Sequence, residues 1–171
     1  MCMCMKLLNT QVLEGKNLLL CGYESGSVAL WDWRNRQIIS EMKCHNEPVI
    51  CLDFDECYRH QGVSGSADKD LSLWELIQPS QLKMKQKVMV TNPGISAVAI
   101  RSDAKIVATG GWDKRLRIFS WKTMKPLAVL DYHGGTVEAL QFSTSSVGRY
   151  SRLLAAGSKD GKISLWSLYN S

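Results

Sequence analysis

Three polar residues in this sequence have the types of a nucleophilic triad. His45 could serve as base, Ser64 as nucleophile and Asp68 as the group that orients the histidine. Ser64, however, stands in Gly62-Val63-Ser64-Gly65-Ser66, which has the pattern of an inner strand and not of a nucleophile elbow. An aspartate also recurs six residues before an aromatic residue in three places, which indicates an architectural role. We therefore expect no catalytic residue and no enzyme activity.

A second set of residues has the types of a zinc site. Cys44 and His45 could combine with Cys57 and His60, but only Cys57 and His60 have the spacing of a tight ligand pair. No glycine-rich phosphate loop precedes a helix. We expect no metal ion and no cofactor, and we expect the six cysteines to be reduced thiols packed as small apolar groups.

The elements that position these residues form a repeat. A glycine is followed nine residues later by tryptophan or phenylalanine four times, as Gly22/Trp31, Gly65/Trp74, Gly110/Phe119 and Gly157/Trp166. A period of roughly 40–45 residues with four short strands per unit is typical of propeller blades. The sequence predicts an all-β propeller, a partial ring of about four blades and about 15 antiparallel strands. The expected blades are 1–43, 44–90, 91–130 and 131–171.

The last expected blade has strands a, b and c but lacks its outer strand d. Only Ser167–Ser171 follow Trp166, which is too short for a turn and a further strand. The N-terminal residues are expected to form the first strand a. We therefore expect the back half of a ring, from a truncated or alternatively started product, with an exposed blade face and an unpaired edge.

Composition places the chain among ordinary globular proteins. It has 171 residues, of which 45% are hydrophobic and 22% charged. No apolar run reaches the roughly 18 residues of a membrane-spanning helix, and Met1–Met5 is too short for a secretory segment. A cytoplasmic or nuclear location, or both, is expected. The net charge is +5, and alternating Lys83, Lys85 and Lys87 indicate either a solvated outer strand or an anion-binding patch.

The whole chain resembles the WD40 family. Four segments resemble more closely the C-terminal half of the ASTRA-associated type of WD scaffold: Gly22–Asp32, Thr91–Ile95, Trp121–Leu130 and Leu153–Tyr169. The resemblance implies a non-enzymatic scaffold for protein–protein interactions in multiprotein assembly complexes, linked to large phosphatidylinositol-kinase-like kinases or chromatin. Nucleic acid and membranes are not expected as partners. A G-protein γ subunit is not expected either, because the coiled-coil helix that holds it is absent from these residues.

The family's structural tetrad is a histidine before strand a, a hydroxyl on strand b, an aspartate in the b–c turn and a tryptophan on strand c. The resemblance assigns this tetrad, complete or in part, to His45, Ser64, Asp68 and Trp74 in blade two, Thr109, Asp113 and Phe119 in blade three, His133, Asp160 and Trp166 in blade four, and Trp31 in blade one. Blade three has Thr91 where the histidine belongs, so its network is expected to be the loosest. Blade four has Ala156 in place of the hydroxyl.

Partner contacts are expected at the rim formed by the b–c turns. The residues just before the turn aspartates, or before Ser25 in blade one, are Glu24, Ala67, Trp112 and Lys159. Trp112 either packs on its own loop or anchors a partner, and Lys114, Arg115 and Arg117 would then surround it with a basic surface suited to an acidic peptide. The alternative is a nucleic-acid or anionic-surface binding module that uses these basic residues and the lysine strand.

Overall fold

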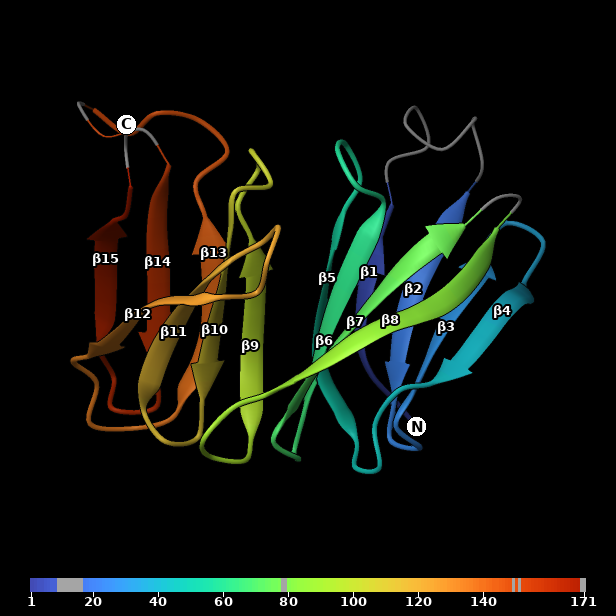
Figure 1. Ribbon diagram of the computed structural model, residues 1–171, viewed down its shortest axis with the longest axis horizontal. Helices are drawn as coiled ribbons and strands as arrows, with labels where there is room; N and C mark the ends of the chain where they lie inside the picture. Colours follow the sequence, from blue (N-terminus) through green and yellow to red (C-terminus); the bar gives the residue numbers. More distant parts are fainter. Residues whose placement is uncertain (9–16, 78–79, 149, 151, 170–171) are drawn as a thin grey trace. The chain divides into compact units, whose positions relative to one another are not determined.

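The computed structural model describes residues 1–8, 17–77, 80–148, 150 and 152–169, and these contain strands and turns but no helix. The chain divides into two compact units, Met1–Ile95 and Ser96–Ser171. Every sheet is antiparallel, and its strands follow one another in chain order (Figure 1). The prediction of an all-β propeller is confirmed.

The first unit contains two four-stranded blades. Their strands are β1 (Cys2–Leu7), β2 (Leu18–Tyr23), β3 (Ser27–Asp32) and β4 (Gln37–Lys43) in blade one, and β5 (Val49–Asp55), β6 (Gln61–Ser66), β7 (Asp70–Ile77) and β8 (Gln81–Met89) in blade two. β8 begins at Gln81, before the alternating lysines that indicated an outer strand. The longer strand has a physical cause, because the backbone N–H of Leu82 donates to the Ser40 hydroxyl and the Leu82 side chain is buried.

The second unit contains the other two blades. Their strands are β9 (Ile95–Ile100), β10 (Ile106–Gly111), β11 (Arg115–Ser120) and β12 (Pro126–Asp131) in blade three, and β13 (Val137–Phe142), β14 (Leu153–Ser158) and β15 (Ile163–Ser167) in blade four. The described residues thus form the fifteen strands that were predicted, with three in the last sheet.

The three four-stranded sheets share a detail of register. The pairing of strands c and d shifts at the same place in blades one to three, between Leu30 and Trp31, Leu73 and Trp74, and Ile118 and Phe119. The repeating aromatic residue therefore follows a β-bulge, which increases the local twist of the sheet. Equivalent positions can accordingly be compared from blade to blade by register.

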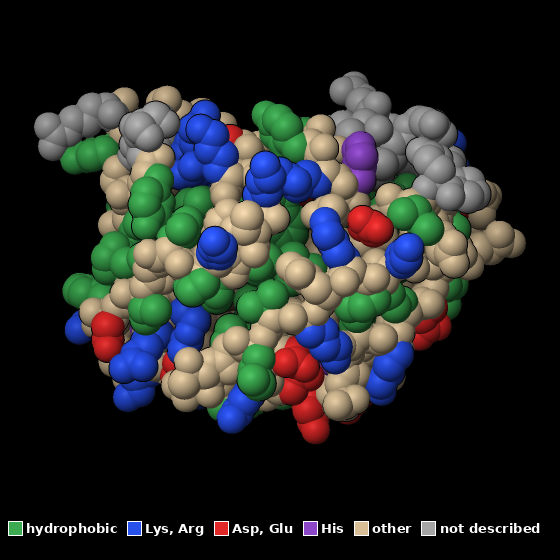
Figure 2. Space-filling model, in the orientation of Figure 1, with side chains coloured by type: hydrophobic (Ala, Val, Ile, Leu, Met, Phe, Trp, Pro, Cys, Tyr) green, Lys and Arg blue, Asp and Glu red, His purple; other side chains and the backbone are tan. Residues whose placement is uncertain are grey.

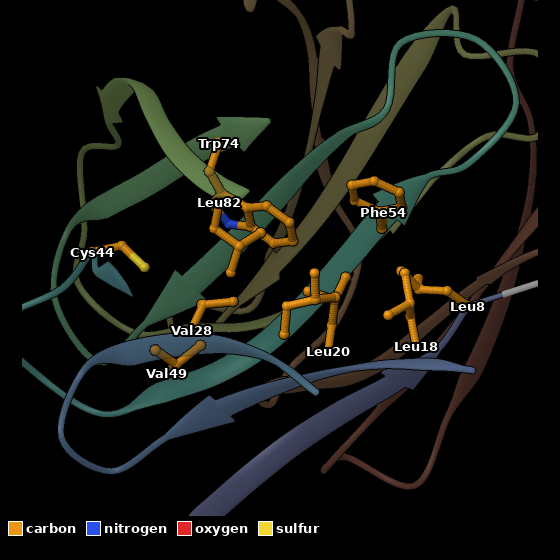
Figure 3. Close-up of a cluster of buried hydrophobic side chains, with 10 residues drawn as sticks. Leu8, Leu18, Leu20, Val28, Cys44, Val49, Phe54, Trp74 and Leu82 are labelled. Atoms are coloured by element: carbon orange, nitrogen blue, oxygen red, sulfur yellow. The ribbon is translucent and has the colours of Figure 1, made fainter. Parts of the chain in front are cut away.

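The core of the first unit lies between blades one and two. Leu18, Leu20, Val28 and Leu30 of blade one pack in one cluster with Phe54, Trp74 and Leu82 of blade two (Figure 3). The Phe54 and Trp74 rings stack with centroids 5.7 Å apart. An aromatic side chain buries about 150–250 Å², so at about 25 cal/mol per Å² its transfer from water stabilises the fold by roughly 4–6 kcal/mol before entropic costs.

The core of the second unit repeats this arrangement between blades three and four. Ile106, Ala108, Leu116 and Ile118 come from blade three, and Phe142, Leu154 and Ala156 come from blade four. In both units the leading blade contributes aliphatic side chains from strands b and c. The following blade contributes a phenylalanine from strand a and a tryptophan from strand c.

A buried arginine holds the chain after β15. Arg101 donates from Nε and Nη2 to the two carboxylate oxygens of Asp103, at 2.9 and 3.0 Å, and from Nη1 to the carbonyl of Leu168 at 2.7 Å. Burial of Asp103 would raise the pKa of its carboxyl, but the bonds from Arg101 and Lys105 and the charge of Arg152 lower that pKa overall. This pair was not predicted. The described residues include no long apolar helix of the kind that crosses a lipid bilayer.

Gly62 provides the space that Trp74 occupies. A Cβ atom at position 62 would lie 2.1 Å from the Trp74 ring, whereas one at Gly157 would meet nothing closer than 3.9 Å. We predict that Gly62→Ala lowers the free energy of unfolding by about 1–3 kcal/mol, the usual cost of overpacking. Gly157→Ala is the matched control and should leave the urea midpoint nearly unchanged. Equal midpoints for the two variants would contradict this account of the core.

Candidate functional site

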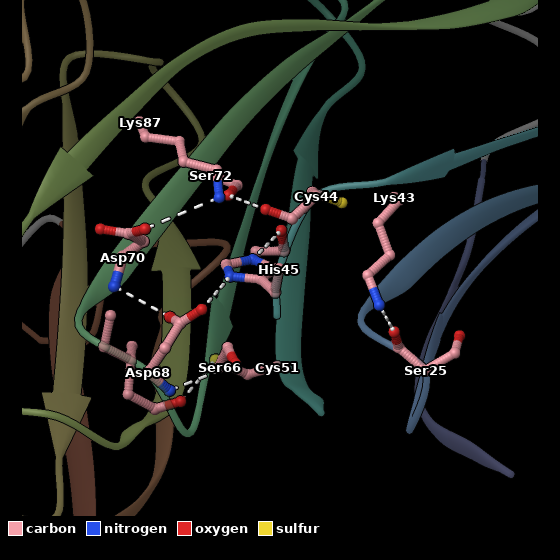
Figure 4. A network of polar contacts seen from close by, with 12 residues as sticks. Ser25, Lys43, Cys44, His45, Cys51, Ser66, Asp68, Asp70, Ser72 and Lys87 are labelled. Carbon is pink, nitrogen blue, oxygen red and sulfur yellow. Dashed lines mark hydrogen bonds and ion pairs between the residues drawn. The ribbon is translucent and has the colours of Figure 1, made fainter. Parts of the chain in front are cut away.

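The most complete polar network lies in blade two, at the boundary with blade one. His45 Nε2 is 2.9 Å from the Ser64 hydroxyl, and its Nδ1 is 3.3 Å from a carboxylate oxygen of Asp68. The indole N–H of Trp74 donates to the same hydroxyl at 3.3 Å. A carboxylate only accepts hydrogen bonds, so Nδ1 carries the proton and Ser64 donates to Nε2. Figure 4 shows His45 turned toward Asp68 within this network.

The Asp68 carboxylate also shapes the turn between β6 and β7. It accepts the backbone N–H of Asp70 at 2.9 Å, while the N–H of Asp68 itself donates to the Ser66 hydroxyl. Burial lowers the pKa of His45 below its ordinary value, and the Asp68 charge only partly opposes this shift. The imidazole is therefore neutral at physiological pH and acts as a fixed hydrogen-bonding link between the turn and strand β6.

The triad-like set cannot reach a substrate in this arrangement. Ser64 is fully buried and bonds to both the imidazole and an indole, and His45 is buried beside it. A nucleophile must contact its substrate, and its base must be free to take the proton. The geometry of these residues suits them to joining strands.

Blade four forms a similar network with a different hydroxyl. His133 Nε2 lies 2.8 Å from the hydroxyl of Ser164, which also accepts the Trp166 indole N–H at 2.7 Å. Ser164 stands directly opposite Ala156 in the β14–β15 register, as Ser72 stands opposite Ser64 in blade two. Opposed residues share a sheet face. The hydroxyl missing from strand b is therefore supplied by the neighbouring strand c.

The Asp160 carboxylate completes the network of blade four. One of its oxygens accepts the backbone N–H of Gly134 at 2.7 Å and also lies 3.5 Å from His133 Nδ1, and the other accepts the N–H of Lys162 at 3.0 Å. These bonds, that from Gly134 foremost, lower the pKa of Asp160 to about 2. The carboxylate is therefore ionised across the physiological pH range.

Blade three replaces the histidine link with an ion pair. Arg117 donates from Nη1 and Nη2 to the two carboxylate oxygens of Asp113, and both side chains are mostly buried. Arg117 lies opposite Thr109 in the β10–β11 register, and Thr109 and Phe119 are buried, whereas Thr91 is exposed. Arg117 thus belongs to the interior of the blade and not to an open basic surface. Blade three, whose polar network was expected to be the loosest, is held by a bidentate ion pair.

In blade one, a tyrosine hydroxyl is the hydrogen-bond acceptor for the Trp31 indole. The Trp31 N–H donates to the hydroxyl of Tyr23 at 2.8 Å. Tyr23 lies at the end of β2, and Trp31 is only partly buried. Trp31, Trp74 and Trp166 are equivalent in register, but they have three different hydrogen-bond acceptors.

The residues considered for zinc lie in different environments. Cys44 is buried and Cys57 exposed, and no group of three or more potential metal ligands occurs within the described ranges. Burial raises the pKa of Cys44 to about 11 and that of Cys4 to about 12. Both thiols are therefore protonated and pack as small apolar groups.

The rim residues are exposed at the turns between strands b and c. Trp112 is 48% exposed in the β10–β11 turn, and Lys114, Lys159 and Glu24 are exposed in their turns. Arg115 is also exposed and lies 3.4 Å from Asp131. Of the three basic residues expected around Trp112, the structure leaves Lys114 and Arg115 at the surface.

One further rim residue was missed by the sequence analysis. Tyr132 is exposed after β12 and meets the His133 and Trp166 rings edge to face, at centroid distances of 5.2 and 6.3 Å. The Lys162 ammonium lies 5.7 Å from the centre of the same ring. The sequence did contain a signal for Tyr132, because this aromatic residue directly precedes the tetrad histidine His133 and therefore lies at the rim.

This blade architecture and its His–hydroxyl–Trp links define a WD-repeat propeller protein. The family model described as "WD domain, G-beta repeat" matches residues 36–75, 85–120 and 124–167. The chain therefore belongs to the WD40 repeat family.

Among similar proteins is guanine nucleotide-binding protein subunit beta-like protein 1 of Mus musculus. It is 52% identical over 152 residues, covering 89% of this chain and 44% of the relative. ASTRA-associated protein 1 of Schizosaccharomyces pombe is 34% identical, with coverage of 89% and 44%, and that of Schizosaccharomyces japonicus is 33% identical, with 92% and 46%. The chain spans about half the length of the curated relatives it matches.

The exchanged hydroxyl of blade four leads to a stability test. Ser164→Ala leaves a buried imidazole and an indole without a partner, so we predict a loss of about 1–3 kcal/mol in the free energy of unfolding. The double variant Ser164→Ala/Ala156→Ser returns the hydroxyl to strand b, as in blade two, and should recover most of that loss. Urea unfolding of the three proteins provides the measurement. A double variant no more stable than Ser164→Ala would show that the hydroxyl position is not exchangeable.

The lowered pKa of His45 predicts a pH dependence of stability. The folded state binds the proton less readily than the unfolded state, whose histidine has its ordinary pKa of 6.5. Stability should therefore fall as the pH is lowered through this value, because the unfolded chain takes up the proton first. His45→Gln should be less stable at neutral pH and should show a shallower dependence. Identical slopes of unfolding free energy against pH for the two proteins would refute the assignment.

Proposed function

We propose that this protein is a non-catalytic WD40 scaffold that binds other proteins through the b–c rim of blades three and four. The observation that carries the proposal is the half-exposed Trp112 at the β10–β11 turn. Tryptophan is enriched at the centres of protein interfaces because it buries a large rigid surface at small entropic cost.

The turn that presents Trp112 is held in place on both sides. The N–H of Lys114 donates to the Gly111 carbonyl at 3.1 Å, and Asp113 is fixed by Arg117. Lys114 itself has a positive φ of 70°, a conformation that few residues adopt without such support. A preorganised turn loses little entropy on binding, which favours affinity.

The charge at this rim favours an acidic partner. Asp113 and Asp131 pair with arginines, and Asp160 is bonded by backbone N–H groups. Lys114 and Lys159 form no salt bridge with any described residue. A partner segment that combines carboxylates with an apolar side chain would therefore complement both these lysines and Trp112.

The names of the relatives support a role in large assemblies. Two of them are called ASTRA-associated protein 1, and the mouse relative is called beta-like. We extend this to a cytoplasmic or nuclear complex, such as one that assembles kinases or acts on chromatin. The tetrad residues would contribute by holding the turns in register, and no cofactor or G-protein γ subunit is required.

Nucleic-acid or anionic-surface binding is less favoured. Lys87 of the lysine strand lies 3.6 Å from Asp70, and Arg117 is occupied by Asp113. On the face drawn in Figure 2, Lys and Arg side chains are scattered among apolar and acidic ones. Phosphate-driven binding would also weaken steeply with salt, which a titration measures.

Affinity capture from cell extract with quantified recovery tests the scaffold proposal. We predict that the protein retains specific partners and that Trp112→Ala reduces their recovery at least tenfold, since loss of an interface anchor costs about 2 kcal/mol or more. The captured proteins should then bind the purified chain directly, with the same difference between the two forms.

Tyr58→Ala provides the matched control. Tyr58 is an equally prominent exposed aromatic residue, but it lies in the β5–β6 turn at the opposite end of the strands. Its variant should retain the partners. Equal recovery with Trp112→Ala in a folded protein would overturn the assignment of the rim.

A further inference from the structure

Charged side chains are unevenly distributed between the two ends of the second unit. The strands of the β9–β12 sheet are antiparallel and follow chain order, so the β9–β10 and β11–β12 turns lie at one end and the β10–β11 turn with Trp112 at the other (Figure 1). The first end, here called the basic end, has five described basic residues and one acidic residue: Arg101, Lys105, Lys122, Lys125, Arg152 and Asp103. The Trp112 end is nearly balanced, because the other acidic residues of the unit lie there: Asp113, Asp131, Glu138 and Asp160.

The acidic residue of the basic end is already engaged. The Asp103 carboxylate accepts two N–H groups of the buried Arg101, at 2.9 and 3.0 Å, and the backbone N–H of Lys105 at 3.1 Å. It also lies 3.2 Å from Nη1 of Arg152, which places this partly exposed residue before β14 beside the β9–β10 turn. One carboxylate cannot balance two arginines, so the basic end keeps an excess of positive charge even before its lysines are considered.

The three lysines of the basic end are free to meet a ligand. Lys105, Lys122 and Lys125 are all exposed, and none of them forms a salt bridge with any described residue. Cations gathered on one surface repel one another and create a positive potential that attracts anions. The basic end is therefore prepared for a partner of opposite charge.

The backbone that carries these lysines is fixed. The N–H of Trp121 donates to the Lys105 carbonyl at 2.9 Å, which joins the β9–β10 turn to the β11–β12 turn. Ala104 and Met124 have positive φ angles of 51° and 55°, and both side chains are buried. The turns are thus held in tight conformations by their own packing, so little backbone entropy would be lost on binding.

We propose that the basic end is a second docking surface, which binds an acidic segment of a partner protein. Lys105, Lys122, Lys125 and Arg152 supply the charge that complements its carboxylates. This inference goes beyond the proposed function and uses none of its residues. Because Trp112 lies at the opposite end of the same strands, the scaffold can hold two partners at once, one at each end of the second unit.

The chemistry of the basic end favours a protein segment over nucleic acid. Trp121 is the aromatic residue of the two lysine-bearing turns, and it is only 1% exposed, so these turns offer no ring for a base to stack on. Lysine acts as a point charge on a flexible stem, whereas the planar fork of arginine matches phosphate geometry. Three lysines on fixed turns can adapt to carboxylates at varied positions along a flexible acidic segment.

Fluorescence anisotropy with the full chain tests the proposal. The probe is a fluorescein-labelled peptide of alternating glutamate and serine, and the same peptide with glutamine in place of glutamate is its neutral counterpart. We predict that the glutamate peptide binds and the glutamine peptide does not. Lys122→Glu/Lys125→Glu should weaken the binding about tenfold or more, because like charges then face each other.

Two variants with the same change in net charge serve as matched controls. Lys83→Glu/Lys85→Glu alters exposed residues of β8, and Lys114→Glu/Lys159→Glu alters the Trp112 end. Both should bind the glutamate peptide like the wild type, since the peptide has no apolar side chain with which to use Trp112. Circular dichroism checks that every variant is folded.

The two docking surfaces can be tested separately. Lys122→Glu/Lys125→Glu should still capture the partners that depend on Trp112, and Trp112→Ala should still bind the glutamate peptide. Failure of the rim proposal would therefore leave the basic end standing, and the reverse also holds.

Three results would overturn the assignment of the basic end. A wild type that does not bind the glutamate peptide would remove the docking surface. An equal loss of binding in all three charge variants would show that only the net charge of the chain matters. Tighter binding of a single-stranded DNA with the same number of charges, dependent on the same lysines, would make the basic end a nucleic-acid surface.

Discussion

The fold depends on one recurring contact, in which a tryptophan of strand c covers strand b of its own blade and packs against the preceding blade. In blade two the Trp74 ring fills the space left by Gly62, stacks on Phe54 and donates its N–H to the Ser64 hydroxyl. The same side chain thus satisfies its polar atom within its own sheet and buries its apolar surface between sheets. Because no blade can bury both of its faces alone, this contact makes each blade dependent on its neighbours.

The tetrad is therefore better understood as a set of requirements than as a set of residues. A turn carboxylate needs donors, a buried imidazole needs an acceptor and a donor, and an indole needs an acceptor. Blade two meets all of them with Ser64. In blade four Ser164 of the opposite strand supplies the hydroxyl, and in blade three Arg117 takes the place of a histidine. Such exchange is possible because opposed residues of paired strands share a face, so either strand can supply the group.

This organisation explains why the surface that varies between blades is the surface suited to recognition. Bonded aspartates hold the turns of blades two to four, and the residues just before them differ from blade to blade, as Ala67, Trp112 and Lys159 do. An exposed tryptophan on a rigid turn is then a consequence of the scaffold beneath it. The exposed aliphatic side chains Ile163 and Leu165 of β15 are of another kind, since their register equivalents in blades one and three are core residues.

Periodicity in the sequence was sufficient to determine the strand type, the number of blades and the positions of the packing aromatic residues. These follow from local alternation and from turn residues that recur at a fixed spacing. The sequence could not show that Ser164 replaces Ala156, that Arg117 turns inward to Asp113, or that Arg101 binds the chain after β15. Each of these depends on which residues lie opposite or across a boundary once the sheets have formed. These contacts are decided by strand register and burial, which arise only when strands pair and sheets pack, and which the sequence of a single strand does not specify.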